Sequence, residues 1–229
     1  MRSALVLALL AIACRSSDGH SQSTSAGTPH TEAASDSARD DAMMKHADFA
    51  RTQGDTSAMW LIIVSDFQCP FCKRWHDEVY PAIVRDYVRT GKVRLAYVNL
   101  PLQQHQHAQE AAEAAMCAAA QDKFWPMHDA LFATQEHWAN LPQATPVFDS
   151  LAHAVGVDST KWRECRRSSA VGRWVDADRN TVVRAGVGST PTFLIGNYTR
   201  VEGAQPLELM RKAIQQAFQT DSAAAAKTP

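Results

Sequence analysis

The most strand-like stretch of the chain is an apolar run at residues 58–65. A helical pattern follows, because apolar residues recur at three- and four-residue spacing through residues 73–89, although Pro81 interrupts them and predicts a kink. Residues 93–100 form a second apolar run. A strand, a helix and a strand of these lengths predict a right-handed parallel crossover.

The rest of the folded region is helical first and strand-like afterwards. Residues 104–185 carry helical spacing almost throughout, with Pro and Gly at the breaks. Two short runs at residues 192–195 and 198–201 flank Gly196-Asn197, which is typical of a β-hairpin. Pro206 opens a last amphipathic helix. Predicted strands therefore lie at both ends of the folded region, with a long helical stretch between them.

The N-terminus has the pattern of an export signal. Arg2 precedes apolar residues at 4–13, a run that is too short to span a bilayer and that ends in a small-residue cleavage site. Cys14 follows directly and resembles the lipidated cysteine of bacterial lipoproteins, although Ala11 stands where that motif usually has Leu. Ordinary cleavage, which leaves Cys14 as a free thiol, is the alternative. Both routes place the mature protein outside the cytosol.

Residues 15–39 are mostly Ser, Thr, Ala, Gly, Asp and His. Such a segment buries too little surface to offset its ordering entropy, so we expect a disordered tether. Residues 40–53 are mixed and could form a short helix or an edge strand. Over all 229 residues the chain is 45% hydrophobic with a formal charge of −1, which is typical of a globular protein and indicates no nucleic-acid partner.

The reactive motif of the chain lies between the first predicted strand and its helix. It reads Asp66-Phe67-Gln68-Cys69-Pro70-Phe71-Cys72. At the first turn of a helix, free backbone N–H groups and the positive end of the helix dipole favour a thiolate on Cys69. Pro70 suits the first helical position, because its missing N–H has no intrahelical partner to lose. This Cys-x-x-Cys therefore predicts redox chemistry.

Half of a zinc site is the alternative interpretation of the two cysteines. It needs two more ligands, and the chain has no second Cys-x-x-Cys, since Cys117 and Cys165 stand alone in helical stretches. His105 and His107 form a His-x-His at a helix start, which is more often a solvated helix end than a metal pair. We therefore predict no metal and no cofactor.

Four segments in a fixed order carry a resemblance to a known family. They are residues 66–72, Leu100-Pro101-Leu102 to Cys117-Ala118, Lys123-Phe124-Trp125 with His128-Asp129-Ala130-Leu131-Phe132, and Gly188-Ser189-Thr190-Pro191-Thr192-Phe193. The chain resembles the DsbA-like thiol:disulfide oxidoreductases over about residues 53–218. The resemblance implies a thioredoxin-like α/β fold, with a mixed central sheet flanked by helices and an inserted all-helical domain.

Together with the pattern, the resemblance predicts the organisation of the chain. The expected parts are a signal peptide at 1–13, a disordered tether at 14–45, a first thioredoxin-like part at 46–102, a helical insertion at 103–185, a second thioredoxin-like part at 186–220 and a disordered tail at 221–229.

The resemblance also implies the roles of the residues in the site. Cys69 would be the nucleophile that exchanges disulfides with a client, and Cys72 would resolve the mixed disulfide. Thr190 and Pro191 would form a cis-proline loop beside the cysteines, where the Thr190 backbone can pair with an extended client. Pro70 would support the site.

Two departures from related proteins modify these roles. Ile63 stands where thioredoxin relatives often carry a buried acid, so Asp66 is the nearest carboxylate; it would relay protons or, as we favour, cap the active-site helix. Phe71 occupies the position where the strongest oxidants of the family have His. Since Phe offers neither charge nor hydrogen bond to the Cys69 thiolate, we expect a lowered thiol pKa and a milder oxidant.

Cys117 and Cys165 remain after the reactive pair is assigned. Some family members staple their helical domain with a second disulfide, and unpaired thiols are a liability in an oxidising compartment, so we predict a Cys117–Cys165 disulfide. Two buried thiols that pack as small apolar side chains are the alternative.

The function implied is the transfer of the Cys69–Cys72 disulfide to folding exported proteins, followed by reoxidation by a membrane partner. The protein would be a monomer in the bacterial envelope or periplasm, because residues 15–52 are too short and too polar for the N-terminal dimerisation domain of related isomerases. A reductase or isomerase of the same fold, a glutathione-dependent transferase on a related scaffold, and a non-catalytic surface lipoprotein whose cysteines are only a staple are the alternatives.

Overall fold

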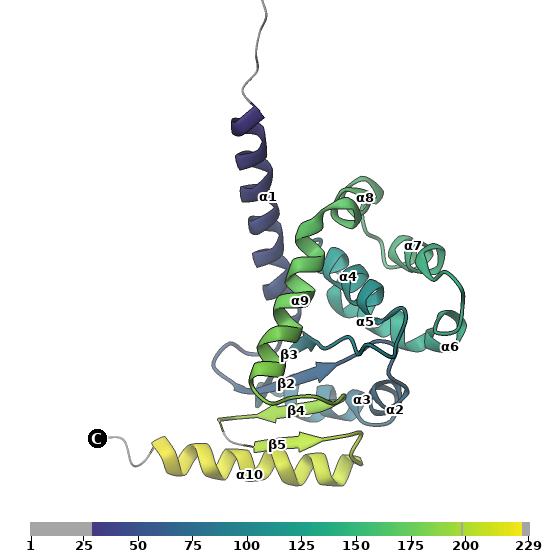
Figure 1. The fold of residues 1–229 in the computed structure, drawn as a ribbon. Coiled ribbons are helices and arrows are strands. Elements are labelled where there is room, and N and C mark those ends of the chain that lie inside the picture. Colours follow the sequence, from purple (N-terminus) through teal and green to yellow (C-terminus); the bar gives the residue numbers. More distant parts are fainter. Residues whose placement is uncertain (1–28, 198, 226–229) are drawn as a thin grey trace, which may run out of the picture.

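The computed structural model describes residues 29–197 and 199–225, and a five-stranded sheet lies at its centre (Figure 1). The strands are β1 (Thr52–Gln53), β2 (Met59–Ser65), β3 (Val93–Asn99), β4 (Thr192–Ile195) and β5 (Thr199–Glu202). Their spatial order is β1-β3-β2-β4-β5, with β2 and β3 parallel and the other pairs antiparallel. The sheet is therefore mixed, as the resemblance implied.

The predicted crossover connects β2 to β3. It consists of α2 (Pro70–Glu78), α3 (Tyr80–Ile83) and the π-helical turn η1 (Val84–Val88). Val79 leaves the helical region between α2 and α3, with φ −121° and ψ −44°. Pro81, in the first turn of α3, lacks the N–H that would continue α2, so the predicted break occurs two residues before it.

The chain between β3 and β4 is helical, as predicted. It forms α4 (Ala108–Ala119), α5 (Phe124–Ala133), α6 (Gln135–Trp138), α7 (Thr145–Ala154), α8 (Ser159–Arg167) and α9 (Ser169–Arg184). Figure 1 shows α4 to α8 gathered above the sheet. Residues 159–184 form two helices rather than one, because Ser168 has extended backbone angles and its hydroxyl accepts a hydrogen bond from the Ala170 amide, which caps α9.

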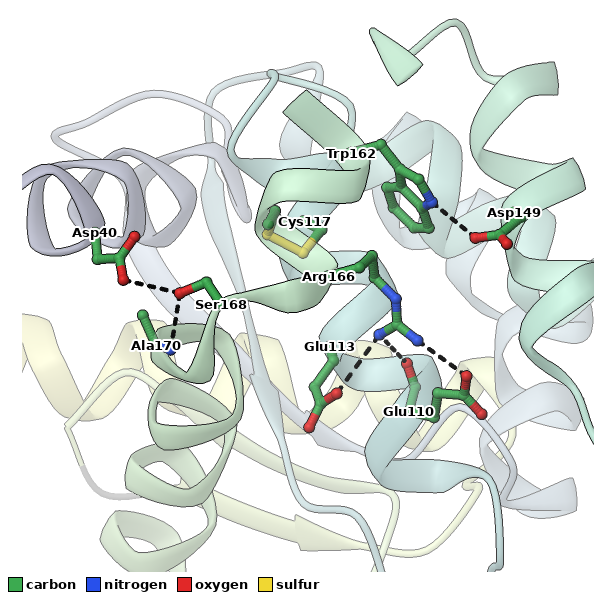
Figure 2. Close-up of a disulfide and its surroundings, with 10 residues drawn as sticks. Asp40, Glu110, Glu113, Cys117, Asp149, Trp162, Arg166, Ser168 and Ala170 are labelled. Carbon is green, nitrogen blue, oxygen red and sulfur yellow. Dashed lines mark hydrogen bonds and ion pairs between the residues drawn. A yellow bond between two sulfur atoms is a disulfide. The ribbon is translucent and has the colours of Figure 1, made fainter. Parts of the chain in front are cut away.

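The expectation of a disordered tether over residues 14–45 is wrong from Pro29 onward, because α1 (Pro29–Ala50) begins there. The C-terminal half of this helix has a surface to pack on, since Met44 and Ala47 are fully buried. The Asp40 carboxylate also accepts a hydrogen bond from the Ser168 hydroxyl at 2.8 Å (Figure 2). Composition misses such anchors because they depend on tertiary contacts. The predicted signal peptide, Cys14 and the start of the tether lie outside the described residues.

The tail expected to be disordered from Asp221 is helical as far as Ala225, at the end of α10 (Leu207–Ala225). Asp221 is held by the β4–β5 hairpin, because its Oδ1 accepts a hydrogen bond from Asn197 Nδ2 at 3.1 Å. Gly196 has φ +57°, and a Cβ at this position would lie 2.6 Å from Asp221 Oδ2. The positive φ favours glycine in the hairpin, and a larger residue here would displace the Asp221 carboxylate.

The disulfide predicted between Cys117 of α4 and Cys165 of α8 is present, so these cysteines are not free thiols (Figure 2). Next to it, Arg166 forms ion pairs with Glu110 at 2.9 Å and Glu113 at 3.5 Å. The disulfide and the ion pairs together join α8 to α4. In the described part of the chain no helix is long and apolar enough to cross a membrane.

Replacing Cys117 and Cys165 together by Ala should destabilise the protein by about 3–4 kcal/mol, because the 48-residue separation no longer restricts the unfolded chain. Guanidinium unfolding of both proteins, with the Cys69–Cys72 pair oxidised in each, measures the difference. A loss below about 1 kcal/mol would mean that the Arg166 ion pairs hold α8 without the disulfide.

Candidate active site

The two reactive cysteines lie where β2 ends and α2 begins. The Cys69 amide donates a hydrogen bond to the Asp66 carbonyl at 3.1 Å, which closes the turn between the strand and the helix. Cys69 is the N-cap of α2 and Pro70 is its first residue, as predicted. The residues Cys69 and Cys72 are 3% and 1% exposed, and both thiols are reduced.

The loop before β4 lies against Cys69. The Thr190–Pro191 peptide bond is cis, as the resemblance implied. The Cys69 thiol donates a hydrogen bond to the Thr190 carbonyl, with sulfur and oxygen 3.5 Å apart. Within residues 29–197 and 199–225, the Thr190 hydroxyl is buried and has no hydrogen-bond partner. That hydroxyl is therefore available to donate to a thiolate.

The surroundings of Cys69 lower the pKa of its thiol from 9.0 to about 6. The largest cause is a hydrogen bond with the Cys72 thiol. The Thr190 side chain and the backbone N–H groups of Cys72 and Phe71 contribute further hydrogen bonds, whereas burial acts against them. Cys69 is thus mostly a thiolate at neutral pH, within the range expected for an activated cysteine without a neighbouring His.

Cys72 has the opposite character. Burial and the hydrogen bond with Cys69 raise the pKa of its thiol well above 9.0, although the Ser65 side chain and the Asp66 N–H partly oppose this. At neutral pH the site therefore holds one nucleophilic thiolate and one protonated thiol. Such a pair can attack a disulfide with the first sulfur and release the product with the second.

Phe71 is 53% exposed beside the cysteines. The Arg74 guanidinium lies over its ring, with the central carbon 5.2 Å from the ring centroid. Phe71 therefore presents an apolar surface next to Cys69.

Asp66 connects the active-site turn to the loop after β3. Its side chain is fully buried, and it accepts hydrogen bonds from the Gln68 amide at 2.7 Å and from the Leu102 amide at 2.9 Å. His105 Nδ1 lies 2.7 Å from the same carboxylate, and this hydrogen bond raises the pKa of His105. The expectation that Asp66 caps α2 is wrong, because no side chain caps that helix.

Two more residues in contact with the active-site turn were missed from the sequence. Gln135 of α6 is buried and donates from Nε2 to the Phe67 carbonyl at 2.6 Å and to the Cys69 carbonyl at 3.1 Å. The His107 amide donates to Gln68 Oε1 at 2.6 Å. The interpretation of the His-x-His as a solvated helix end is wrong for His107, which is buried. The two histidines make separate structural contacts, because His105 faces Asp66 whereas His107 Nε2 lies 2.7 Å from the Leu141 carbonyl.

The comparisons with known proteins agree with this geometry. A sequence model of the thioredoxin family matches residues 47–216. Three solved structures share the fold: Wolbachia pipientis alpha-DsbA1 (21% identity, 74% of this chain and 91% of the other, TM-score 0.66), Bacillus subtilis BdbD (20%, 74% and 92%, 0.66) and Pseudomonas aeruginosa DsbA2 (25%, 73% and 93%, 0.58).

Curated relatives are matched over part of their length. A Na⁺/H⁺ antiporter, NhaA 3 of Salinispora tropica, is 33% identical over 67% of this chain and 22% of its own. A Rickettsia typhi protein, provisionally named a protein-disulfide oxidoreductase, is 25% identical over 59% of this chain and 50% of its own. The chain thus spans between a fifth and a half of these relatives.

A nucleophilic thiolate beside a protonated thiol at the edge of this sheet can carry out thiol–disulfide exchange. The chain belongs to the thioredoxin family.

Replacing Cys72 by Ala should raise the pKa of Cys69 from about 6, because the largest contribution to its lowering is the hydrogen bond with Cys72. The thiolate absorbance of Cys69 followed against pH measures this shift. Cys72→Ser, which keeps a donor, should shift the pKa less. If Cys69 has the same pKa in both variants as in the wild-type protein, its thiolate is stabilised by the helix dipole and Thr190 and not by Cys72.

Replacing Asp66 by Asn should destabilise the protein by roughly 1–3 kcal/mol at pH 6 and by less at pH 9. The Asp66 hydrogen bond raises the pKa of His105, so the pair stabilises the fold fully below the unfolded value of 6.5 and loses this contribution as pH rises through the folded value. Urea unfolding of the disulfide form, in which the active-site thiols do not titrate, measures both losses. Equal losses at the two pH values would contradict a charged pair.

Proposed function

We propose that this protein is a thiol:disulfide oxidoreductase of the DsbA-like kind, which introduces disulfides into exported proteins through Cys69 and Cys72. The observation that supports the direction is the asymmetry of the two thiols, because a stabilised Cys69 thiolate favours the reduced form of the pair and so makes its disulfide an oxidant. A client thiolate attacks the Cys69 sulfur of the disulfide and Cys72 leaves. A second client thiolate then attacks its own partner sulfur and releases the Cys69 thiolate, so two electrons pass from the client to the enzyme.

The expected oxidant is a mild one. Lowering the pKa of Cys69 from 9.0 to about 6 stabilises the reduced form at pH 7 by about 1.4 kcal/mol, which corresponds to about 30 mV. That is small beside the difference of about 150 mV between thioredoxin and the strongest oxidant of this fold. Phe71 is consistent with this, because an apolar ring adds nothing to the stability of the thiolate.

The client would bind across the loop before β4. Phe71 is an exposed apolar side chain in the active-site turn, and the Thr190 carbonyl contacts the Cys69 thiol. An extended, apolar segment of an unfolded protein fits both features, since it can pair with the Thr190 backbone and cover the ring.

The site of action would be the bacterial envelope. Residues 1–13 have the pattern of a signal peptide, and lipidation at Cys14 would anchor the mature chain to a membrane; the mass of the mature N-terminal peptide tests this. A membrane redox partner would reoxidise the Cys pair. The protein would act as a monomer.

The reduction potential of the Cys69–Cys72 pair, measured by equilibrium with glutathione in a Cys14→Ser protein, tests the proposed direction. We expect a value between about −120 and −180 mV and nearer to −180 mV, with faster reactivation of reduced, unfolded ribonuclease in the presence of the oxidised enzyme. Cys69→Ser is the control, since it keeps the Cys117–Cys165 disulfide and should lose both signals. A potential below about −230 mV would make the protein a reductase.

A further inference from the structure

Three side chains with metal-binding atoms meet between α2 and α5. His76 projects from the active-site helix α2, and His128 and Asp129 project from α5 of the helical insertion. Asp129 Oδ1 lies 2.8 Å from His128 Nδ1 and 3.2 Å from His76 Nε2, and the three atoms all lie within 4.8 Å of one another. No spacing in the sequence indicates this group, because His76 and Asp129 are 53 positions apart.

The two hydrogen bonds of the His76 ring indicate a position for a cation between its Nε2 and Asp129. Its Nδ1 lies 2.9 Å from Asp77 Oδ1, and its Nε2 faces Asp129. A neutral imidazole carries one N–H, so it can donate to only one of the two carboxylates, and its other nitrogen then directs a lone pair at an oxygen. The lone pair and the carboxylate oxygen repel each other. A second proton on the imidazole, or a metal ion between Nε2 and Asp129, removes this repulsion.

Both histidine rings are held in place by packing. His76 stacks on Tyr80 and Phe132, with centroids 5.4 and 4.9 Å apart. His128 is buried and packs edge-on against Tyr97 and Phe132, at 5.3 and 5.1 Å. Rings that are already oriented lose little freedom when they bind a ligand, and this favours a site with affinity for an ion.

The chemistry of the group suits a metal. His128 is buried with its Nδ1 directed at the Asp129 carboxylate, and His76 directs its Nε2 at the same oxygen, so two imidazoles and one carboxylate converge. Asp77, bonded to the second nitrogen of His76, is the kind of carboxylate that orients a metal-binding histidine.

The group opens onto solvent on one side. His76 and Asp129 line a cavity of about 590 Å³ together with Gln53, Tyr80, Pro81, Val84, Arg85, Arg89, Trp125 and Ala133. Of the two arginines in this lining, Arg85 is paired with Asp86 at 2.7 Å. The cavity leaves room for a water molecule as a fourth ligand.

We propose that His76, His128 and Asp129 bind a divalent transition metal, with Zn²⁺ the ion that two imidazoles, one carboxylate and an open fourth position fit best. Ligand atoms of tetrahedral zinc lie roughly 3.3 Å apart, so the observed separations, which reach 4.8 Å at most, need adjustments of up to about 1.5 Å. The ion replaces protons and joins the helix that carries the reactive cysteines to the helical insertion. It takes no part in electron transfer.

Calorimetric titration with ZnCl₂ tests the site. The full chain is used without a His tag, with the Cys69–Cys72 pair oxidised and Cys14 alkylated, so that no thiol can bind the ion. We expect one Zn²⁺ per chain and a higher melting temperature with Zn²⁺ but not with Mg²⁺. His76→Gln and Asp129→Asn should each weaken binding at least tenfold, and Asp77→Asn about tenfold.

His153→Gln is the matched control, because His153 is exposed on α7 and should leave binding unchanged. Absence of stoichiometric binding to the wild-type protein, or equal binding by His76→Gln and Asp129→Asn, would overturn the proposal. Should either variant fail to fold, the side-chain ¹⁵N resonances of His76 and His128 in the wild-type protein decide: shifts of both on addition of Zn²⁺ support the site, and shifts of neither overturn it.

Discussion

Four residue pairs between β2 and β4, from Leu61–Ile195 to Val64–Thr192, hold together two segments that are far apart in the chain. Because β2 ends next to the residue at which β4 begins, the turn after β2 and the loop before β4 must meet at one edge of the sheet. Cys69 and Thr190, which are 121 positions apart, come into contact there. The location of the chemistry thus follows from strand pairing, and the helical insertion can vary in length without separating the two segments.

This meeting point also makes the two thiols unequal. Cys69 lies at the start of α2, among donors from the helix, from Cys72 and from Thr190, and these donors stabilise its charge. Cys72 is one turn further into the helix and is covered by the sheet, where burial keeps its proton in place. A single turn of helix therefore separates a nucleophile from a thiol that stays protonated, and no charged neighbour is needed to produce the difference.

Features set by neighbouring residues could be predicted from the sequence pattern, whereas distant contacts could be predicted only where the family resemblance implied them, as for Cys117 and Cys165. The N-cap position of Cys69 and the crossover after it depend on local pattern, and both are present. For residues 40–53 the pattern left a short helix or an edge strand open, because composition does not show that Met44 meets the core. The contacts of His105 and Gln135 were missed for a similar reason: their partners Asp66 and Cys69 are 39 and 66 positions away, and no motif links them.

The contacts that the sequence did not predict show that the helical insertion supports the active-site turn. Gln135 bonds two carbonyls of the active-site turn, and Gln68 in that turn donates to the Ala139 carbonyl at 2.7 Å. Since buried carbonyls need donors, removal of the insertion would leave the turn with unsatisfied groups and with Phe67 uncovered. The insertion is therefore part of the structure that holds Cys69 in place. A change in how α5 and α6 pack on α2 would therefore shift the position of the Cys69 sulfur through these hydrogen bonds. The sheet would not have to move.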